Sequence, residues 1–491
     1  MTLLLRRARL VGAGDELVDV LVREGRVAAL APRVEADAAT EVIDLDGRFV
    51  HPGLWDGHVH SGQVSMAARR LDVSGADSAA EVVALVRARL DVAPPAPGDV
   101  LLGFGFRDGL WPEEPQPEDL ELGEHAVSLV SGDVHTVWSN RAALATIDRG
   151  PDDWWLREQD AFDANIAFSV VPEAVLDRWA IEDAGAWARR GIVGIHDLEM
   201  EDAPGAWARR VAAGFGGLRV RAGVYPAGLD AAVGVRTGVA IEGTRGLVEG
   251  GSFKLFTDGS LNTRTAWCAE PYPDLEGAEA FGLATYELDE LVALAREGLA
   301  QGLVPTIHAI GDRAVTMALD VFAALGPLPG GARGRLEHAQ LVAARDLPRF
   351  AELGVVASVQ PAHALDDRDV ADHFWAGRTD RAFPLRALLD AGAELALGSD
   401  APVAALDPWR TISAAVSRTR DGLAPWHPEQ RITTAEALAV SVGGGPARVE
   451  VGGVADLIVL EADPLTASGE QLASMPVVGT LLGGDWTHRA L

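Results

Sequence analysis

Eight apolar runs that each end at or near a polar residue constrain the fold of this 491-residue chain more than any other feature. Helix-like segments follow most of them, so strand and helix alternate through the middle of the sequence. Alternation at this count is typical of a parallel (β/α)8 barrel. An open doubly wound sheet is the alternative, but no glycine-rich nucleotide fingerprint supports it. The runs are 49–60, 192–197, 218–225, 253–258, 304–308, 335–338, 355–360 and 395–400.

Both ends of the chain contain short strand-like runs separated by turn residues, with no helical periodicity between them. Neither end has enough strands to be stable alone, so we expect residues 1–50 and 445–491 to form one composite β-sandwich domain. Residues 51–444 would then form the barrel. The predicted fold class is α/β, a TIM-like (β/α)8 barrel with a small β-sandwich built from both termini.

A long insertion, at about 62–185, separates the first two predicted strands. It is too long for an ordinary connection, and it carries clusters of aromatic and polar residues such as 133–140. Active sites of such barrels lie at the carboxyl ends of the strands, where an inserted segment can form a lid or a wall. Alternatively, the insertion is structure without a role at the active site, with a few buried tryptophans. The sequence leaves both interpretations of the insertion open.

Charge and cysteine content exclude several classes of protein. The formal net charge is −30, which argues against binding to nucleic acid or to an anionic membrane surface. Cys268 is the only cysteine, so an intramolecular disulfide is impossible. The sequence shows no signal peptide and no apolar stretch of membrane-spanning length. We expect a cytoplasmic protein with a small-molecule substrate; the oligomeric state is open, and a homodimer is one option.

Lys254 is the only lysine among the 42 lysine and arginine residues. It lies within an apolar, strand-like run, where a buried cation is costly. Lysine differs from arginine in having an amine that can lose its proton and react as a nucleophile. Two chemistries need such an amine: a Schiff base with a carbonyl substrate, and a carbamate that can bridge two metal ions.

Histidines and an aspartate occupy the ends of several predicted strands. His58 and His60 are two residues apart, so in a strand both imidazoles face one side, a spacing that suits a metal ion. Further polar residues end the fifth, sixth and eighth runs, where the carboxyl ends of barrel strands converge. Together they predict a metal site with six candidate ligands: His58, His60, Lys254, His308, His338 and Asp400.

Several motifs resemble those of the amidohydrolase superfamily, and more narrowly its YtcJ-like branch (amidohydrolase family 3), which includes N-substituted formamide deformylases. The motifs are 52–60, 133–140, 253–260, 308–312, 337–340 and 398–400. The resemblance implies two divalent metal ions, for which zinc is favoured although such ligands accept other ions. His58, His60 and Asp400 would hold one ion, His308 and His338 the other, and carboxylated Lys254 would bridge them.

The same resemblance implies hydrolysis of a C–N bond in an amide, such as an N-substituted formamide. A metal-bridging hydroxide would attack the carbonyl carbon, with Asp400 as general base and then general acid. A barrel lyase that uses Lys254 as a Schiff base and a catalytically inactive binding protein are the alternatives. Candidate substrate contacts are His135, Trp138, Asn140, Asp258 and Arg264. We expect Cys268 to be a buried thiol rather than a ligand, and we assign structural or surface roles to His125, His363, His373, His427 and His488.

Overall fold

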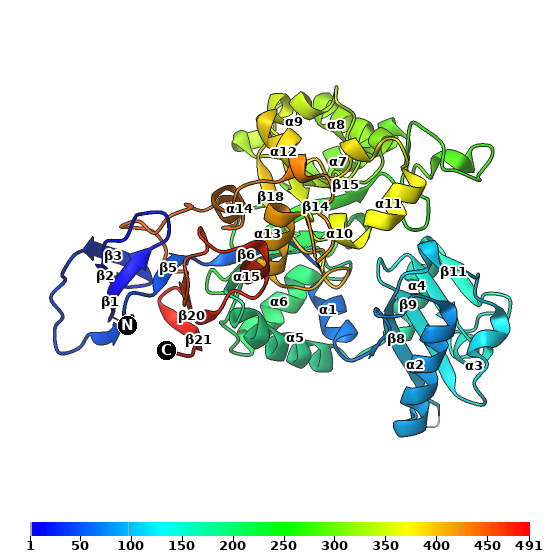
Figure 1. The fold of residues 1–491 in the computed structure, drawn as a ribbon, viewed down its shortest axis with the longest axis horizontal. Coiled ribbons are helices and arrows are strands. Elements are labelled where there is room, and N and C mark those ends of the chain that lie inside the picture. The colour runs from blue at the N-terminus through cyan, green and yellow to red at the C-terminus, as the bar shows by residue number, and fades with distance from the viewer. Residues whose placement is uncertain (1, 97, 421) are drawn as a thin grey trace.

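The computed structural model describes residues 2–96, 98–420 and 422–491. Figure 1 shows three parts: a barrel in the centre, a sheet that contains both chain termini on one side, and a separate lobe on the other. The chain enters the barrel from the sheet, leaves it once for the lobe, and ends back in the sheet.

The barrel consists of eight parallel strands that pair in chain order. Phe256 of the fourth strand lies beside His308, and Ala309 of the fifth lies beside His338. This register places candidate ligands of neighbouring strands at similar heights along the barrel axis. The first and last strands meet at a single parallel bridge, Val59–Ala401, which leaves the barrel nearly closed. The predicted barrel is therefore confirmed. Its strands are β6 (Leu54–Val59), β12 (Ile192–Asp197), β13 (Arg219–Val224), β14 (Val248–Phe256), β15 (Pro305–Ala309), β16 (Arg335–His338), β17 (Val356–Val359) and β18 (Leu395–Leu397).

The longer helices around the barrel pack against its strands, as α7 does against β14 and α8 against β15. In α7 the buried positions Leu291, Val292, Ala295 and Gly298 recur every three to four residues, as in an amphipathic helix. A Cβ on Gly298 would lie 2.4 Å from the ring of Phe253, so glycine permits the close approach of α7 to β14. The principal helices are α1 (Ser61–Ala67), α5 (Glu173–Ala188), α6 (Ala203–Ala212), α7 (Leu288–Ala300), α8 (Asp312–Leu325), α9 (Leu347–Leu353), α10 (His363–Asp366), α11 (Arg368–Phe374), α12 (Leu385–Asp390), α13 (Pro408–Ser417) and α14 (Thr434–Val440).

Strands from the two chain ends share one mixed sheet, as the sequence predicts. Val50 of β5 pairs antiparallel with Val459 of β19, which joins the N-terminal strands to the C-terminal ones. Leu3, Leu457 and Leu481 contribute to a common apolar core. The strands are β1 (Thr2–Leu10), β2 (Val18–Arg23), β3 (Arg26–Ala31), β4 (Glu41–Asp44), β5 (Phe49–Pro52), β19 (Leu457–Leu460), β20 (Val477–Leu482) and β21 (Asp485–Arg489).

The lobe is the central part of the predicted insertion. It has its own five-stranded sheet and its own apolar cores, one of which contains Phe106 and Trp138. The first and last helices of the 62–185 segment, α1 and α5, pack against each other and α5 also packs against β12 and α6, so both belong to the barrel wall. The elements of the lobe are β7 (Leu71–Asp72), α2 (Ala79–Val92), β8 (Val100–Phe106), β9 (Ala126–Ser131), β10 (Thr136–Ser139), α3 (Arg141–Ala145), β11 (Trp155–Arg157) and α4 (Gln159–Phe168).

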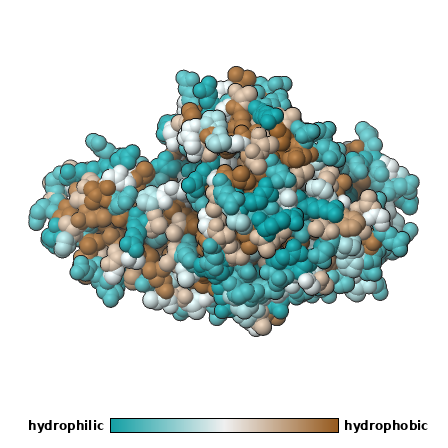
Figure 2. All heavy atoms as spheres, turned by 90° about the horizontal axis from the view of Figure 1, so that it is seen from above, coloured by the Kyte–Doolittle hydropathy of each residue, from teal (hydrophilic) through white to brown (hydrophobic). Residues whose placement is uncertain are grey.

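The surface in Figure 2 is mostly hydrophilic, with smaller hydrophobic patches, one of them at the end occupied by the terminal sheet. Within the described ranges, no helix combines the length and the apolar composition needed to cross a membrane.

Candidate metal centre and active site

All six predicted ligands line a single pocket at the carboxyl end of the barrel. They come from the ends of five strands that are far apart in the sequence, and the parallel arrangement brings them to the same end of the barrel. The pocket is lined by His58, His60, Lys254, His308, His338 and Asp400, together with residues of the lobe.

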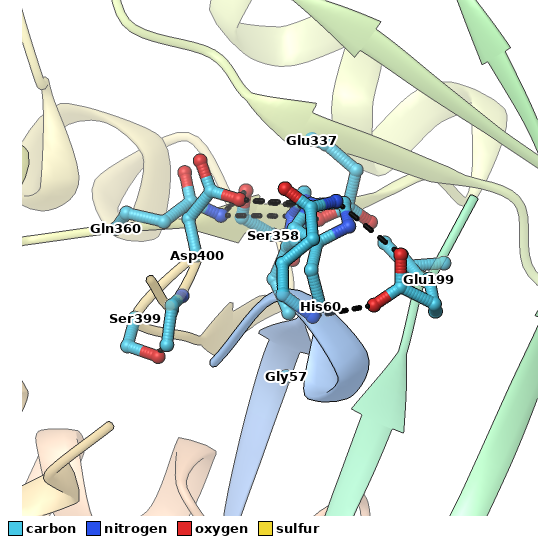
Figure 3. A network of polar contacts seen from close by, with 12 residues as sticks. Gly57, His60, Glu199, Glu337, Ser358, Gln360, Ser399 and Asp400 are labelled. Carbon is cyan, nitrogen blue, oxygen red and sulfur yellow. Dashed lines mark hydrogen bonds and ion pairs between the residues drawn. The ribbon is translucent and has the colours of Figure 1, made fainter. Parts of the chain in front are cut away.

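Four imidazole rings and one carboxylate converge in this pocket. Asp400 Oδ1 lies 3.1 Å from His58 Nε2 and 3.3 Å from His60 Nε2. The ring centroids of His308 and His338 are 4.5 Å apart, and those of His58 and His338 are 5.1 Å apart. His58, His338 and Asp400 each place one ligand atom within 4.8 Å of the others, close enough to share an ion. Figure 3 shows His60, Glu337 and Asp400 together, with Glu199 beside them.

The protonation states of His58 and His338 suit a metal ion, whereas Asp400 outweighs burial and raises the pKa of His60. Burial lowers the pKa of His58 to about 4 and that of His338 well below its usual value, so both rings are neutral near pH 7. Neutral imidazole is the form that coordinates a metal. His60 Nδ1 and His338 Nδ1 are buried without a hydrogen-bond partner among the described residues. Buried nitrogens without partners are costly. An ion bound to His338 Nδ1 would satisfy that nitrogen, whereas His60 faces Asp400 with its other nitrogen, Nε2. The residues therefore fit a divalent metal.

Lys254 is buried to 1 % exposure in β14, and its amine faces the pocket. Burial lowers the pKa of Lys254 to about 8, although the charges of Glu337 and Asp400 act in the opposite direction. Within the part of the chain that the structure describes, the amine makes no hydrogen bond or ion pair. At pH 7 the amine is still mostly protonated, but its neutral fraction, the reactive form of an amine, is far larger than in an ordinary lysine.

The backbone at two predicted ligands is in the left-handed region, with φ of 75° at His338 and 58° at Asp400. Non-glycine residues rarely adopt it, and such strain concentrates at functional sites. Neighbouring contacts hold the Asp400 loop: its backbone N–H donates to His58 O at 2.8 Å, and Asp56 accepts from the backbone N–H of Ser399. A Cβ on Gly398 would lie 2.7 Å from His58 N, so only glycine permits this approach of β18 to β6.

The lobe forms one wall of the pocket. Its Phe106, Val134, His135 and Phe162 line the cavity, so of the two interpretations of the insertion, the wall is the one that the structure supports. Hydrogen bonds tie the lobe to the loop after β14. Examples are Ser260 Oγ to Asp133 Oδ2 at 2.9 Å, Thr263 Oγ1 to Glu158 Oε1 at 2.7 Å and Asn262 Nδ2 to Asp108 Oδ1 at 3.1 Å.

Of the five predicted substrate contacts, His135 lines the pocket and the other four do not. Trp138 is fully buried in the core of the lobe. Asn140 caps α3 and binds the backbone of Val127, so its role is structural. The Asp258 carboxylate accepts hydrogen bonds from backbone N–H groups, including that of Gly311 at 2.8 Å. Arg264 lies over the ring of Phe374.

Two residues of the site, Glu337 and His363, were not predicted from the sequence. Glu337 precedes a predicted ligand in the 337–340 motif but was given no role; it is fully buried and 2.8 Å from His58 Nδ1. The structural or surface role assigned to His363 needs correction. His363 is 4 % exposed and lines the pocket, 3.9 Å from Asp400 Oδ2. Its position directly after the seventh strand was the available signal, because barrel active sites lie there. Cys268 is a buried free thiol, as expected.

A parallel barrel whose strand ends bring histidines, an aspartate and a lysine into one pocket defines the class of metal-dependent barrel hydrolases. The profile of the Amidohydrolase family matches residues 41–488, and the chain belongs to this family.

Comparisons with individual proteins agree with this family membership. The chain is 26% identical to N-substituted formamide deformylase of Arthrobacter pascens over 95% of this chain and 94% of that protein. It is 26% identical to the putative amidohydrolase YtcJ of Bacillus subtilis over 91% and 90%. Protein LONG AFTER FAR-RED 3 of Arabidopsis thaliana is 34% identical, but over only 48% of this chain and 42% of its own length.

Among solved structures, an uncharacterized metal-dependent hydrolase from Pyrococcus horikoshii matches with a TM-score of 0.78 and 25% identity, covering 96% of this chain and 99% of that chain. A second, from Pyrococcus furiosus, matches with a TM-score of 0.73 and 25% identity, covering 95% of this chain and 100% of that one.

Proposed function

We propose that this protein hydrolyses the C–N bond of a small amide, with N-substituted formamides as the first substrates to test. The observation that supports this most is the convergence of four imidazoles, Asp400 and Lys254 on one pocket. The similarity to an N-substituted formamide deformylase over nearly the full length of both chains suggests the substrate class.

His58, His60 and Asp400 would hold one divalent ion, His308 and His338 a second, and a carbamate on Lys254 would lie between them. Zinc is the metal that this donor set favours. Two such ions would supply an acidified water molecule and would polarise the substrate carbonyl. The lowered pKa of Lys254 favours carbamate formation, because carbon dioxide reacts with the neutral amine.

Asp400 would move the proton. Its carboxylate lies in the pocket at the carboxyl end of the barrel. Oδ1 faces His58 and His60, which leaves Oδ2 open to the pocket. It would accept the proton of the attacking water and deliver it to the leaving nitrogen. The apolar side chains Phe106, Phe162 and Val134 would surround the N-substituent and exclude bulk water.

The direct test is a screen of N-formyl and N-acetyl amines with purified protein whose metal content has been measured. We expect hydrolysis that a chelator abolishes and that added zinc restores. Asp400→Asn should lower kcat by about 10²–10⁴-fold, since an amide cannot accept the proton. An Asp400→Asn variant within a few-fold of wild type, or substrate trapped on Lys254 by borohydride, would contradict the proposal.

A further inference from the structure

His363 is a buried pocket residue whose ring has one nitrogen without a partner. It lies at the start of α10, directly after the loop that follows β17. Its Nε2 is buried and has no hydrogen-bond partner among the residues that the structure describes. Leaving such a group unsatisfied is costly, and a native structure seldom does so without a reason. A ligand that enters the pocket could satisfy it.

The position of this nitrogen relative to Asp400 suggests which ligand atom it meets. Asp400 Oδ1 faces His58 and His60, whereas Oδ2 lies 3.9 Å from His363 Nε2. That distance is too long for a direct hydrogen bond. Asp400 and His363 therefore flank a common space, in which both could contact one bound molecule.

Gln340 determines which nitrogen of His363 carries the proton. Gln340 Nε2 lies 3.4 Å from His363 Nδ1. With the nitrogen of its amide turned toward the ring, Gln340 can only donate, so Nδ1 accepts. In a neutral ring the proton then resides on Nε2, which becomes a hydrogen-bond donor directed into the pocket.

We propose that His363, held in the Nε2–H tautomer by Gln340, is a catalytic residue that donates a hydrogen bond to the carbonyl oxygen of the bound amide and to the oxyanion that develops from it. This inference rests on the proposed amide hydrolysis. A donor needs an acceptor, and in an amide the acceptor is the oxygen, because the nitrogen lone pair is delocalised. A donor already positioned where negative charge develops stabilises the transition state more than the ground state.

The proton balance of the reaction leaves His363 unchanged. The oxygen of water bonds to the carbonyl carbon, and the proton of water passes to Asp400. Asp400 returns it to the leaving nitrogen as the C–N bond breaks, which gives a carboxylic acid and an amine. His363 keeps its proton throughout and contributes only the hydrogen bond.

The kinetic test compares three substitutions. His363→Phe removes the donor and should lower kcat by about 10²–10³-fold with little change in KM. His363→Gln retains an N–H donor and should recover part of the loss. His373→Phe is the matched control, because His373 is an exposed histidine on the neighbouring helix α11 and should turn over like wild type. Metal content and circular dichroism must be unchanged in all three.

Two further measurements do not depend on turnover. A phosphonamidate of the same amine mimics the tetrahedral oxyanion, and titration calorimetry should show that its affinity falls in His363→Phe by a factor similar to the loss in kcat. Nitrogen-15 NMR of labelled histidine should find His363 as the Nε2–H tautomer.

The outcomes separate this inference from the proposed function. If wild type hydrolyses amides but His363→Phe remains within threefold of it, or the NMR shows an Nδ1–H tautomer, the role of His363 is wrong while amide hydrolysis stands. If wild type hydrolyses no amide, the proposed function is wrong, and the inference about His363 is wrong as well.

Discussion

His58 and Glu337 are separated by 279 residues in the chain, yet His58 Nδ1 lies 2.8 Å from Glu337 Oε2 in the interior of the barrel. The hydrogen bond leaves His58 Nε2 free to face Asp400. The other carboxylate oxygen accepts from Thr306 Oγ1 at 2.7 Å and Arg335 Nε at 2.9 Å. Burial raises the pKa of Glu337, but Arg335 and His58 outweigh that effect and hold it well below its usual value. Glu337 is therefore a fixed anion that orients a candidate metal ligand.

Replacing Glu337 by glutamine should weaken metal binding about 10–100-fold, which is the usual effect of losing the group that orients a ligand histidine. The change also leaves the Arg335 guanidinium, which is only 13% exposed, without its anion, so a lower Tm is expected. Competition with a chelator measures the affinity. Glu394→Gln removes a half-exposed carboxylate paired with Arg333 and is the control. Equal zinc affinities in the two variants would contradict the orienting role.

Lys254→Ala should lose the second metal ion and most activity, because the proposed bridging anion disappears. Acetate, a short carboxylate, should restore part of both by occupying the vacated space. Lys254→Arg keeps the positive charge but cannot form a carbamate, so it should fail in the same way. Metal analysis and turnover check this. Two bound ions with normal turnover in Lys254→Arg would show that no carbamate is needed.

The ion pair between His135 and Glu158 should make stability fall at alkaline pH. Burial lowers the pKa of His135, but Glu158, 2.7 Å away, outweighs this and raises it to about 9. The folded pKa thus exceeds the unfolded value of about 6.5. The pair then contributes about 3 kcal/mol to the free energy of unfolding. This contribution is fully present below pH ~6.5 and is lost as the pH rises through about 9.

Thermal unfolding of wild type and His135→Gln at pH 6.5 and pH 9.5 tests this prediction. The Tm difference between the two proteins should be large at the lower pH and small at the higher one. His427→Gln, which disrupts a more exposed pair with Glu429, is the control for loss of a histidine ion pair. A His135→Gln difference that is the same at both pH values would disprove the protonated pair.

Deleting residues 452–491 should make the protein insoluble although every candidate metal ligand remains. The deletion removes β19, which pairs with β5, and β20, which pairs with β19; both cover the apolar core that contains Leu3 and Leu5. Exposed core and an unpaired strand edge promote aggregation. Deleting only 485–491 removes the edge strand β21 and should leave soluble protein. A soluble, metal-loaded chain of residues 1–451 would show that the two ends fold independently.

The sequence by itself determined the barrel, the shared terminal sheet and the six candidate ligands. These features depend on local patterns: apolar runs of strand length, helical periodicity as in α7, and the position of a polar residue at the end of a run. Such patterns can be interpreted without knowing the tertiary contacts, because strand direction alone places residues such as His308 and His338 at the same end of a barrel.

Only the tertiary structure decided which polar residues belong to the site. Trp138 and Asn140 look like contacts in the sequence, but folding places them inside the lobe. Glu337 and His363 look ordinary, but folding places them against His58 and Asp400. The physical reason is that a hydrogen bond depends on distances of about 3 Å between atoms, and those distances arise from packing between segments that are far apart in the sequence.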